Sequence, residues 1–349
     1  MISSESFSAD HIRSIQMRSG RDPALIERTI FALGLLEALA RTGFPFIFKG
    51  GTALMLFMDS LRRLSTDIDI VVSPGIEVDD YLKTAATIWP FFEMREHMRN
   101  VVGEIDKRHF KFSFTSPLTS RTYTILLDIL FEENPYSTTI ERSIESELLV
   151  VSEPIVKIRM PNANCIIADK LTVFAPNTTG IPYNVDKELE IIKQLYDIAA
   201  LLDYVDDLAE IKINYYDIAM TELKYRGMVD KTPDDALRDT INTAACVAAR
   251  GLLRHDEYVL LKKGINSISN HIFSESFNGE VAVQRACMVM YIAAAILSRQ
   301  DKLPDLKDDD HYRSSVVLVK EYSKLGYIKK MDILAYKYLI EAVEMLVES

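Results

Sequence analysis

Hydrophobic residues follow two different periods along this chain, and the change of period divides it. In about the first 150 residues, a normal size for one domain, short apolar runs and alternating segments predict strands. These strands are Phe46–Phe48, Ile68–Val72, His109–Thr115 and Tyr123–Phe131. Apolar positions at helical spacing predict helices over Asp22–Thr42, Ala53–Leu61 and Val78–Ile88. We therefore predict a small mixed α/β unit that ends in a hairpin turning at Pro117–Ser120.

The remainder of the chain carries mainly helical patterns. The predicted helices are Pro161–Phe174, Lys187–Val205, Ile211–Tyr225, Pro233–Leu252, Glu280–Leu297 and Met331–Val347, with breaks at Pro176–Pro182, Lys263–Gly264 and Pro304–Asp310. We expect an α+β protein with a domain over residues 1–160 and a helical domain over residues 161–349. The longest apolar run, Ala286–Leu297, is shorter than the roughly 20 residues of a membrane span, so we expect a buried helix and no membrane partner.

Composition narrows the range of functions. The 349 residues include 40 Lys and Arg against 51 Asp and Glu, a net charge of −11, which argues against a general nucleic-acid coat. No secretory signal is visible at Met1–Glu5. Cys165, Cys246 and Cys287 lie far apart, and the six histidines lack ligand spacing, so we expect neither a disulfide framework nor a zinc site. A reduced, cytoplasmic setting is the expectation.

Candidate chemistry is concentrated between Phe46 and Val72. Gly50-Gly51-Thr52 separates a predicted strand from a predicted helix. Two glycines let the backbone approach a phosphate, to which the helix-start N–H groups and the Thr52 hydroxyl can donate. A purely structural turn is the alternative.

Carboxylates form the second feature. Asp67 and Asp69 stand at i and i+2, so a strand would place both on one face. Like charges this close repel, and a Mg²⁺ between them would relieve the repulsion. Asp128 interrupts another apolar strand. If the strands are neighbours, three carboxylates converge, as in two-metal phosphoryl or nucleotidyl transfer sites. The alternative places these acids on solvated surfaces.

The combination Gly50-Gly51-Thr52-Ala53-Leu54 and Arg63-Leu64-Ser65-Thr66-Asp67-Ile68-Asp69 resembles the signature of AbiEii-type nucleotidyltransferase toxins. This family belongs to the DNA polymerase β-like nucleotidyltransferase superfamily, and the MenT toxins are relatives. Downstream, Asp169-Lys170-Leu171 is similar to the family's helical lysine motif, and Asp197 matches an acid of its Arg-Asp-x-x-Asp segment. Gln194 departs from the pattern, because an acid is common there.

The resemblance implies a polymerase β-like N-terminal domain and a catalytic site. By this match, Asp67, Asp69 and Asp128 would be catalytic and hold two Mg²⁺ ions. The nucleoside triphosphate would be bound by Gly50, Gly51, Thr52, Arg63, Ser65, Lys170 and Asp197. NMP would pass to an acceptor hydroxyl, a tRNA 3′ end first, a protein hydroxyl second and a small molecule such as an antibiotic third. The resemblance also implies a cognate antitoxin and a role in abortive infection.

Two other functions stay open at this level. The fold could bind a nucleotide or a partner without turnover, which Gln194 and the low positive charge favour. It could also be a scaffold without a ligand, which would make the aligned acids accidental.

Overall fold

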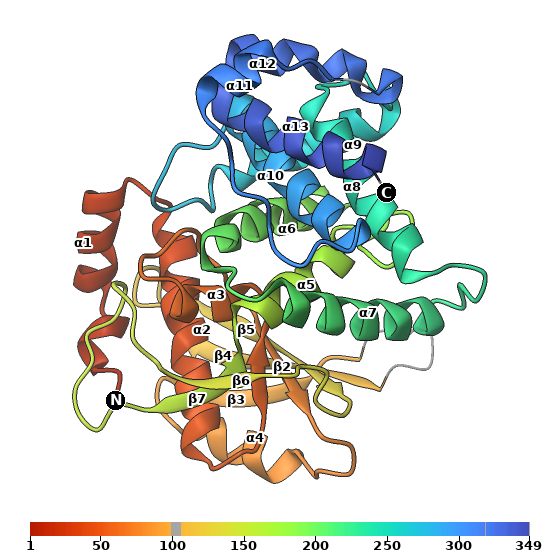
Figure 1. Cartoon of the computed structure of the whole chain (residues 1–349). Coiled ribbons are helices and arrows are strands. Elements are labelled where there is room, and N and C mark those ends of the chain that lie inside the picture. The colour runs from red at the N-terminus through yellow and green to blue at the C-terminus, as the bar shows by residue number, and fades with distance from the viewer. Residues whose placement is uncertain (99–105, 318, 349) are drawn as a thin grey trace. The chain divides into compact units, whose positions relative to one another are not determined.

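The computed structural model describes residues 1–98, 106–317 and 319–348 (Figure 1). The chain groups into two compact units. Unit 1 comprises residues 1–162 and 270–275, and unit 2 comprises residues 163–269 and 276–348 of the described chain. The domain boundary that we expect between residues 160 and 161 stays a prediction. Sequence patterning did not indicate that residues 270–275 group with unit 1.

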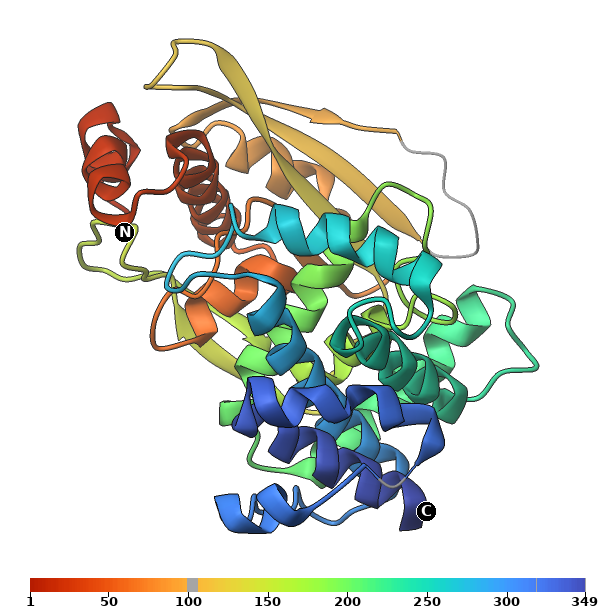
Figure 2. The ribbon, with the colours of Figure 1, turned by 90° about the horizontal axis from the view of Figure 1, so that it is seen from above.

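Unit 1 is built on a mixed sheet. Among the described residues, its strands are β1 (Ile47–Lys49), β2 (Ile68–Val72), β3 (Phe91–Glu96), β4 (Lys107–Thr115) and β5 (Thr122–Phe131). Their order is β1-β2-β5-β4-β3, with β2 and β5 parallel and the other pairs antiparallel. Figure 2 shows the long strands β4 and β5 twisting together. A separate antiparallel hairpin joins β6 (Thr139–Ser143) to β7 (Lys157–Pro161).

Helices cover one face of this sheet. The helices of unit 1 are a 3₁₀ turn at Ser4–Phe7, α1 (Ala9–Ser19), α2 (Pro23–Arg41), α3 (Gly50–Phe57) and α4 (Asp79–Ala85). Helix α2 packs on β5 and β2 (Figure 1). Phe31 of α2 stacks on Phe114 of β4 with ring centroids 3.9 Å apart. Phe110, Phe112 and Ile125 are buried on the same face. Because side chains alternate along a strand, the other face carries the polar residues between these positions.

The mixed α+β class that the pattern predicts is confirmed, and so are the four predicted strands within one or two residues. In unit 1, sequence reasoning missed α1, β3, β6 and β7, and in unit 2 it missed the helices at His255–Ile268, Asp309–Ser314 and Ile328–Met331. Strand β3 lies at the edge of the sheet and most of its residues are at least partly exposed, so it lacks a clear apolar alternation. Strands β6 and β7 also lack a clear apolar alternation, because exposed residues interrupt both of them.

The turn predicted at Gly50-Gly51-Thr52 is wrong in one respect. These residues are the first turn of α3 itself, which ends at Phe57 rather than Leu61. Gly50 adopts a φ of +79°, a conformation that glycine enters without strain, and so it lets the chain pass directly from β1 into the helix. Buried Ala53, Leu54 and Met55 then anchor α3 in unit 1.

The regular secondary structure of unit 2 is helical in its described residues. Its helices are α5 (Ala163–Val173), α6 (Glu188–Leu201), α7 (Leu208–Tyr225), α8 (Pro233–Ala248), α9 (His255–Ile268), α10 (Gly279–Leu297), α11 (Asp309–Ser314), α12 (Ile328–Met331) and α13 (Ile333–Glu348), with 3₁₀ turns at Leu202–Tyr204 and Lys320–Tyr327. Helix α10 packs against α8 and α13. It is long and apolar enough to cross a membrane, but 78% of its most apolar window is buried, as expected for a core helix.

The predicted break at Lys263–Gly264 is wrong, because both residues lie inside α9. A Cβ at Gly264 would lie 2.2 Å from the backbone oxygen of Glu188. Glycine is therefore required for close packing of α9 on the start of α6, and not for a turn. The three cysteines are buried and reduced, and burial raises the pKa of Cys246 to about 12.

Candidate active site

A row of charged side chains crosses the sheet of unit 1. The parallel register pairs Asp69 of β2 with Asp128 of β5. The antiparallel registers extend this row to Lys49 on β1 and to His109 on β4. Directly paired residues project to the same face, so we call Lys49, Asp69, Asp128 and His109 the carboxylate row. It occupies the face opposite the buried Phe110 and Leu127.

His109 contacts Asp128 directly, and sequence reasoning missed this residue. Its Nδ1 lies 2.7 Å from Oδ1 of Asp128, with 13% of the histidine side chain and 32% of the aspartate side chain exposed. The sequence held a usable signal, because the predicted hairpin 109–131 brings His109 opposite Asp128 when the turn is centred at Pro117–Ser120. Histidine spacing along one segment could not show it, because the two residues belong to different strands.

The third predicted carboxylate does not join the other two. Asp67 is exposed and precedes β2, so the ladder to β5 does not hold it. Within residues 1–98, 106–317 and 319–348, no three His, Cys, Asp or Glu side chains are grouped closely enough to hold a metal ion. Strand pairing thus places Asp69 beside Asp128. Asp67 lies two residues before Asp69, outside the ladder, and the convergence of all three carboxylates on metal stays a prediction.

The pair has the donor chemistry of a divalent-cation site. Hard cations such as Mg²⁺ prefer carboxylate oxygens, and they relieve repulsion between neighbouring carboxylates. Lys49 and His109 flank the two acids within the row and provide positive or hydrogen-bonding neighbours. Asp69 and Asp128 therefore fit one divalent ion, and they are the residues of unit 1 that would hold it.

Gly50 places the backbone directly against this pair. A Cβ at Gly50 would lie 2.1 Å from Oδ2 of Asp69, too close for any other residue without movement of that carboxylate. The positive φ of Gly50 adds a second requirement for glycine. The start of α3 and the Asp69 carboxylate are therefore in contact. A phosphate at the helix start would thus lie close enough to Asp69 for one cation to bind both.

Gly51 contacts a second group of the predicted residues. A Cβ there would lie 2.5 Å from Nη2 of Arg63 and 3.0 Å from Oγ of Ser65. Arg63 is buried, and its Nη1 donates to the backbone oxygen of Leu64 at 3.3 Å. The structure thus brings together Gly51, Arg63 and Ser65 at the start of α3.

The Thr52 hydroxyl donates to the protein backbone in the structure. Thr52 is fully buried, and its Oγ1 donates to the backbone oxygen of Asp67 at 2.5 Å. This bond ties α3 to the segment that carries Asp67 and Asp69. Thr52 therefore positions the loop, while the backbone N–H groups at the helix start remain the candidates for phosphate binding.

Residues 270–275 secure the Arg63 segment within unit 1. Leu64 N donates to His271 O at 2.8 Å, and Phe273 N donates to Arg62 O at 2.8 Å. These bonds fix the backbone on both sides of Arg63.

Lys170 and Asp197, both expected at the nucleotide, lie in unit 2 and bind each other. Lys170 Nζ on α5 is 2.6 Å from Oδ2 of Asp197 on α6, and the two side chains are 6% and 2% exposed. Lys170 also donates to Oε1 of Gln194 at 3.2 Å. Gln194, the departure from the family pattern, is thus a direct partner of Lys170.

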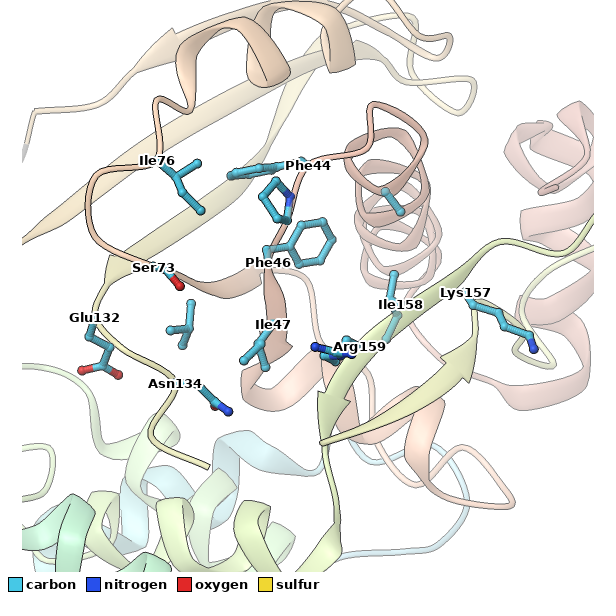
Figure 3. A pocket seen from close by; sticks show the side chains of 13 residues that line it. Phe44, Phe46, Ile47, Ser73, Ile76, Glu132, Asn134, Lys157, Ile158 and Arg159 are labelled. Atoms are coloured by element: carbon cyan, nitrogen blue, oxygen red, sulfur yellow. The ribbon is translucent and has the colours of Figure 1, made fainter. Parts of the chain in front are cut away.

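Unit 1 also contains a cavity of about 440 Å³ at the start of β1 (Figure 3). Its lining includes Phe46 just before β1 and Ile47 of β1, Glu132 and Asn134 after β5, and Lys157 and Arg159 of β7, which Figure 3 labels. Val71 of β2 also lines it, one same-face step from Asp69 and so about 7 Å along the strand. The cavity therefore begins close to the carboxylate row without including its acids.

Comparisons with known proteins identify one family and two solved structures that are similar to this chain. The model of the family described as "Nucleotidyl transferase AbiEii toxin, Type IV TA system" matches residues 35–257. JHP933 from Helicobacter pylori is similar in structure at 13% identity, with a TM-score of 0.41, over 86% of this chain and 94% of that one. A candidate nucleotidyltransferase from H. pylori is similar at 14% identity, with a TM-score of 0.44, over 80% of this chain and 99% of the other. No curated protein matches.

Proposed function

Because this chain belongs to the AbiEii family of nucleotidyltransferase toxins of type IV toxin–antitoxin systems, we propose that it transfers NMP from an NTP to an acceptor hydroxyl with the help of Mg²⁺. The observation that carries the proposal is the pairing of Asp69 with Asp128, with the Gly50 backbone against Asp69. Family membership implies an NTP substrate and an antitoxin partner. The metal, the acceptor and a cytoplasmic location are our proposals.

Each residue of unit 1 has a separate task in this proposal. Asp69 and Asp128 hold a divalent ion, and Asp67 completes the ligand set, with a second ion, once the nucleotide is bound. The helix-start N–H groups of α3, with Ser65 and Arg63, bind the β- and γ-phosphates. When bound, the ion stabilises negative charge on the transferred phosphate and on the leaving group.

The chemical step is a balanced substitution at phosphorus. The acceptor oxygen forms a bond to the α-phosphorus while the bond from that phosphorus to the bridging oxygen breaks. Pyrophosphate leaves with the electron pair, and the acceptor proton passes to the carboxylate of Asp128. The acceptor then carries NMP through a phosphodiester bond.

The buried pair of unit 2 limits what Lys170 can do. Its amine already contacts Asp197 at 2.6 Å and Gln194 at 3.2 Å, so it would have to give up these partners to bind a phosphate. We propose that Lys170 contacts the triphosphate only if it exchanges Asp197 for phosphate oxygens, and that Asp197 otherwise holds the lysine in place.

The cavity in Figure 3 supports a nucleic-acid acceptor over a protein or an antibiotic. Lys157 and Arg159 offer positive charge, Phe46 offers an aromatic ring, and Asn134 offers an amide. Single-stranded nucleic acids bind to this combination of backbone-tracking cations and stacking rings. The net charge of −11 gives no long-range attraction for RNA, so a local group of cations is needed. A tRNA 3′ end is therefore the first acceptor to test.

The test incubates the full chain with each α-labelled NTP, Mg²⁺ and total RNA or cell lysate. We expect label in RNA with wild type and with Asp80→Ala, a control acid on α4 whose side chain is 98% exposed. We expect none with Asp69→Ala. Label in protein would show that the acceptor is a protein hydroxyl, and the proposed NMP transfer would stand. Equal labelling by wild type and Asp69→Ala would overturn the proposed site.

Binding without turnover is the second candidate, and the Gln194 contact favours it. Gln194 accepts from Lys170 where an acid is common in the family pattern. Mg²⁺-dependent NTP binding without release of pyrophosphate would establish this function instead.

A further inference from the structure

We propose that His109 is a positioning residue, which holds the carboxylate of Asp128 in the orientation that a divalent ion needs. This inference rests on the proposed function and assigns a role to a side chain outside the motifs of the sequence. The histidine contacts Asp128 through one ring nitrogen at 2.7 Å.

The backbone around His109 is held on both sides, so its ring is a fixed support. Strand β4 pairs with β5 along Lys107–Thr115 and with β3 on its other edge. In addition, His97 N donates to His109 O at 2.7 Å. Only 13% of the His109 side chain is exposed. A ring fixed in this way restricts rotation of the carboxylate that it contacts.

The opposite neighbour of Asp128 explains why such restraint matters. Asp69 is paired with Asp128 on the other side, and two like charges favour rotation away from each other. The hydrogen bond from Nδ1 of His109 to Oδ1 keeps Asp128 in one orientation while the pair waits for a cation. Partners that orient metal-binding carboxylates typically change metal affinity or activity by about 10–100-fold when they are removed.

The substitutions His109→Asn and His109→Gln both introduce an amide, but they place its N–H donor at different positions. The side-chain nitrogen of asparagine can occupy the place of Nδ1, so His109→Asn keeps a donor toward Asp128. Glutamine extends its amide to the place of Nε2 and lacks the donor near Oδ1. His109→Leu removes hydrogen bonding altogether. Lys111→Met is the matched control, because Lys111 lies one same-face step along β4 and pairs with Leu126 instead of Asp128.

The experiment measures Mn²⁺ affinity of the full chain by electron paramagnetic resonance, together with kcat and KM for the NTP. We expect His109→Leu and His109→Gln to weaken Mn²⁺ binding about 10–100-fold and to lower kcat. His109→Asn and Lys111→Met should stay within a few-fold of wild type. Thermal melting confirms that each variant is folded, and His109→Gln and His109→Asn, which share a polar amide, remain comparable if the leucine variant unfolds.

Two failures can be told apart. If Asp69→Asn and Asp128→Asn leave Mn²⁺ binding unchanged, the proposed function loses its metal site. If both weaken binding while His109→Leu and His109→Gln match wild type, the proposed function stands and the positioning role is overturned. Equal weakening by His109→Asn and His109→Gln would also overturn it, because the donor position would then be irrelevant.

Discussion

The carboxylate row of unit 1 and the Lys170–Asp197 pair of unit 2 combine similar charged groups in opposite surroundings. In the row, the Asp128 side chain is 32% exposed and two acids are neighbours. In unit 2, a lysine and an aspartate with side chains 6% and 2% exposed neutralise each other. The first arrangement gains from an added cation, whereas the second is already satisfied. The comparison teaches that a sequence match to a motif does not show whether a charged residue is available to a ligand.

The largest effect on stability is expected when the buried Lys170–Asp197 pair is broken. Lys170→Met should lower the free energy of unfolding by about 3–5 kcal/mol, because it leaves Asp197 charged and buried without its lysine. The double variant Lys170→Met/Asp197→Leu should recover most of this stability, since apolar pairs often replace buried ion pairs at no cost. Urea unfolding of the full chain measures both. A loss below about 1 kcal/mol for Lys170→Met would contradict the account of a buried pair whose partners depend on each other.

The next effect concerns activity instead of stability. Asp69→Asn and Asp128→Asn should each reduce NMP transfer by about 100–1,000-fold, because charge in the transition state loses its stabilising group. Each should change the free energy of unfolding by less than Lys170→Met does, since each relieves the repulsion between the two acids while weakening the contact with Lys49 or His109. Labelled-NTP transfer and urea unfolding check this contrast with unit 2. Variants with a lower free energy of unfolding but full specific activity would contradict the comparison.

Gly50 and Gly43 form a matched test of how closely the backbone must approach the row. Both have positive φ, +79° and +76°, so an alanine strains the backbone equally at each. A Cβ at Gly50 meets Asp69, whereas a Cβ at Gly43 meets nothing within 4 Å. Gly50→Ala should therefore reduce transfer by up to about a hundredfold through a displaced carboxylate. Gly43→Ala should lower the melting temperature through backbone strain alone and keep normal activity, and equal activities of the two variants would contradict the account.

The smallest effect lies at the exposed start of α8 in unit 2. Thr232 and Asp235 form a capping box, so Thr232→Ala should cost about 1 kcal/mol of stability and no activity. Hydrogen bonds from the Thr232 backbone and side chain lower the pKa of Asp235. This stabilisation is therefore present above the ordinary aspartate pKa of about 3.9 and is lost as pH falls through the lowered value. Thermal melting at pH 7 and at pH 3 measures the difference, which should shrink in acid.

Much of unit 1 was predictable because its strands carry clear signals. Phe110, Phe112 and Phe114 alternate with polar residues, and the apolar strand around Asp128 follows after a proline-containing turn. The pairing of β2 with β5 was a conditional expectation, because sequence alone does not determine which strands are neighbours. His109 was missed for a different reason: its partner Asp128 follows from the register of the predicted hairpin, whereas only the spacing of histidines along single segments was considered. The burial of Lys170 depends on packing between α5 and α6, which helical periodicity does not reveal.

The most direct measurement is a crystal structure of the full chain with Mn²⁺ and a non-hydrolysable NTP, in which anomalous scattering locates the ion. The account predicts a peak about 2.0–2.2 Å from carboxylate oxygens of both Asp69 and Asp128, with His109 still hydrogen-bonded to Asp128. A peak that contacts neither acid, with the nucleotide bound elsewhere, would contradict it.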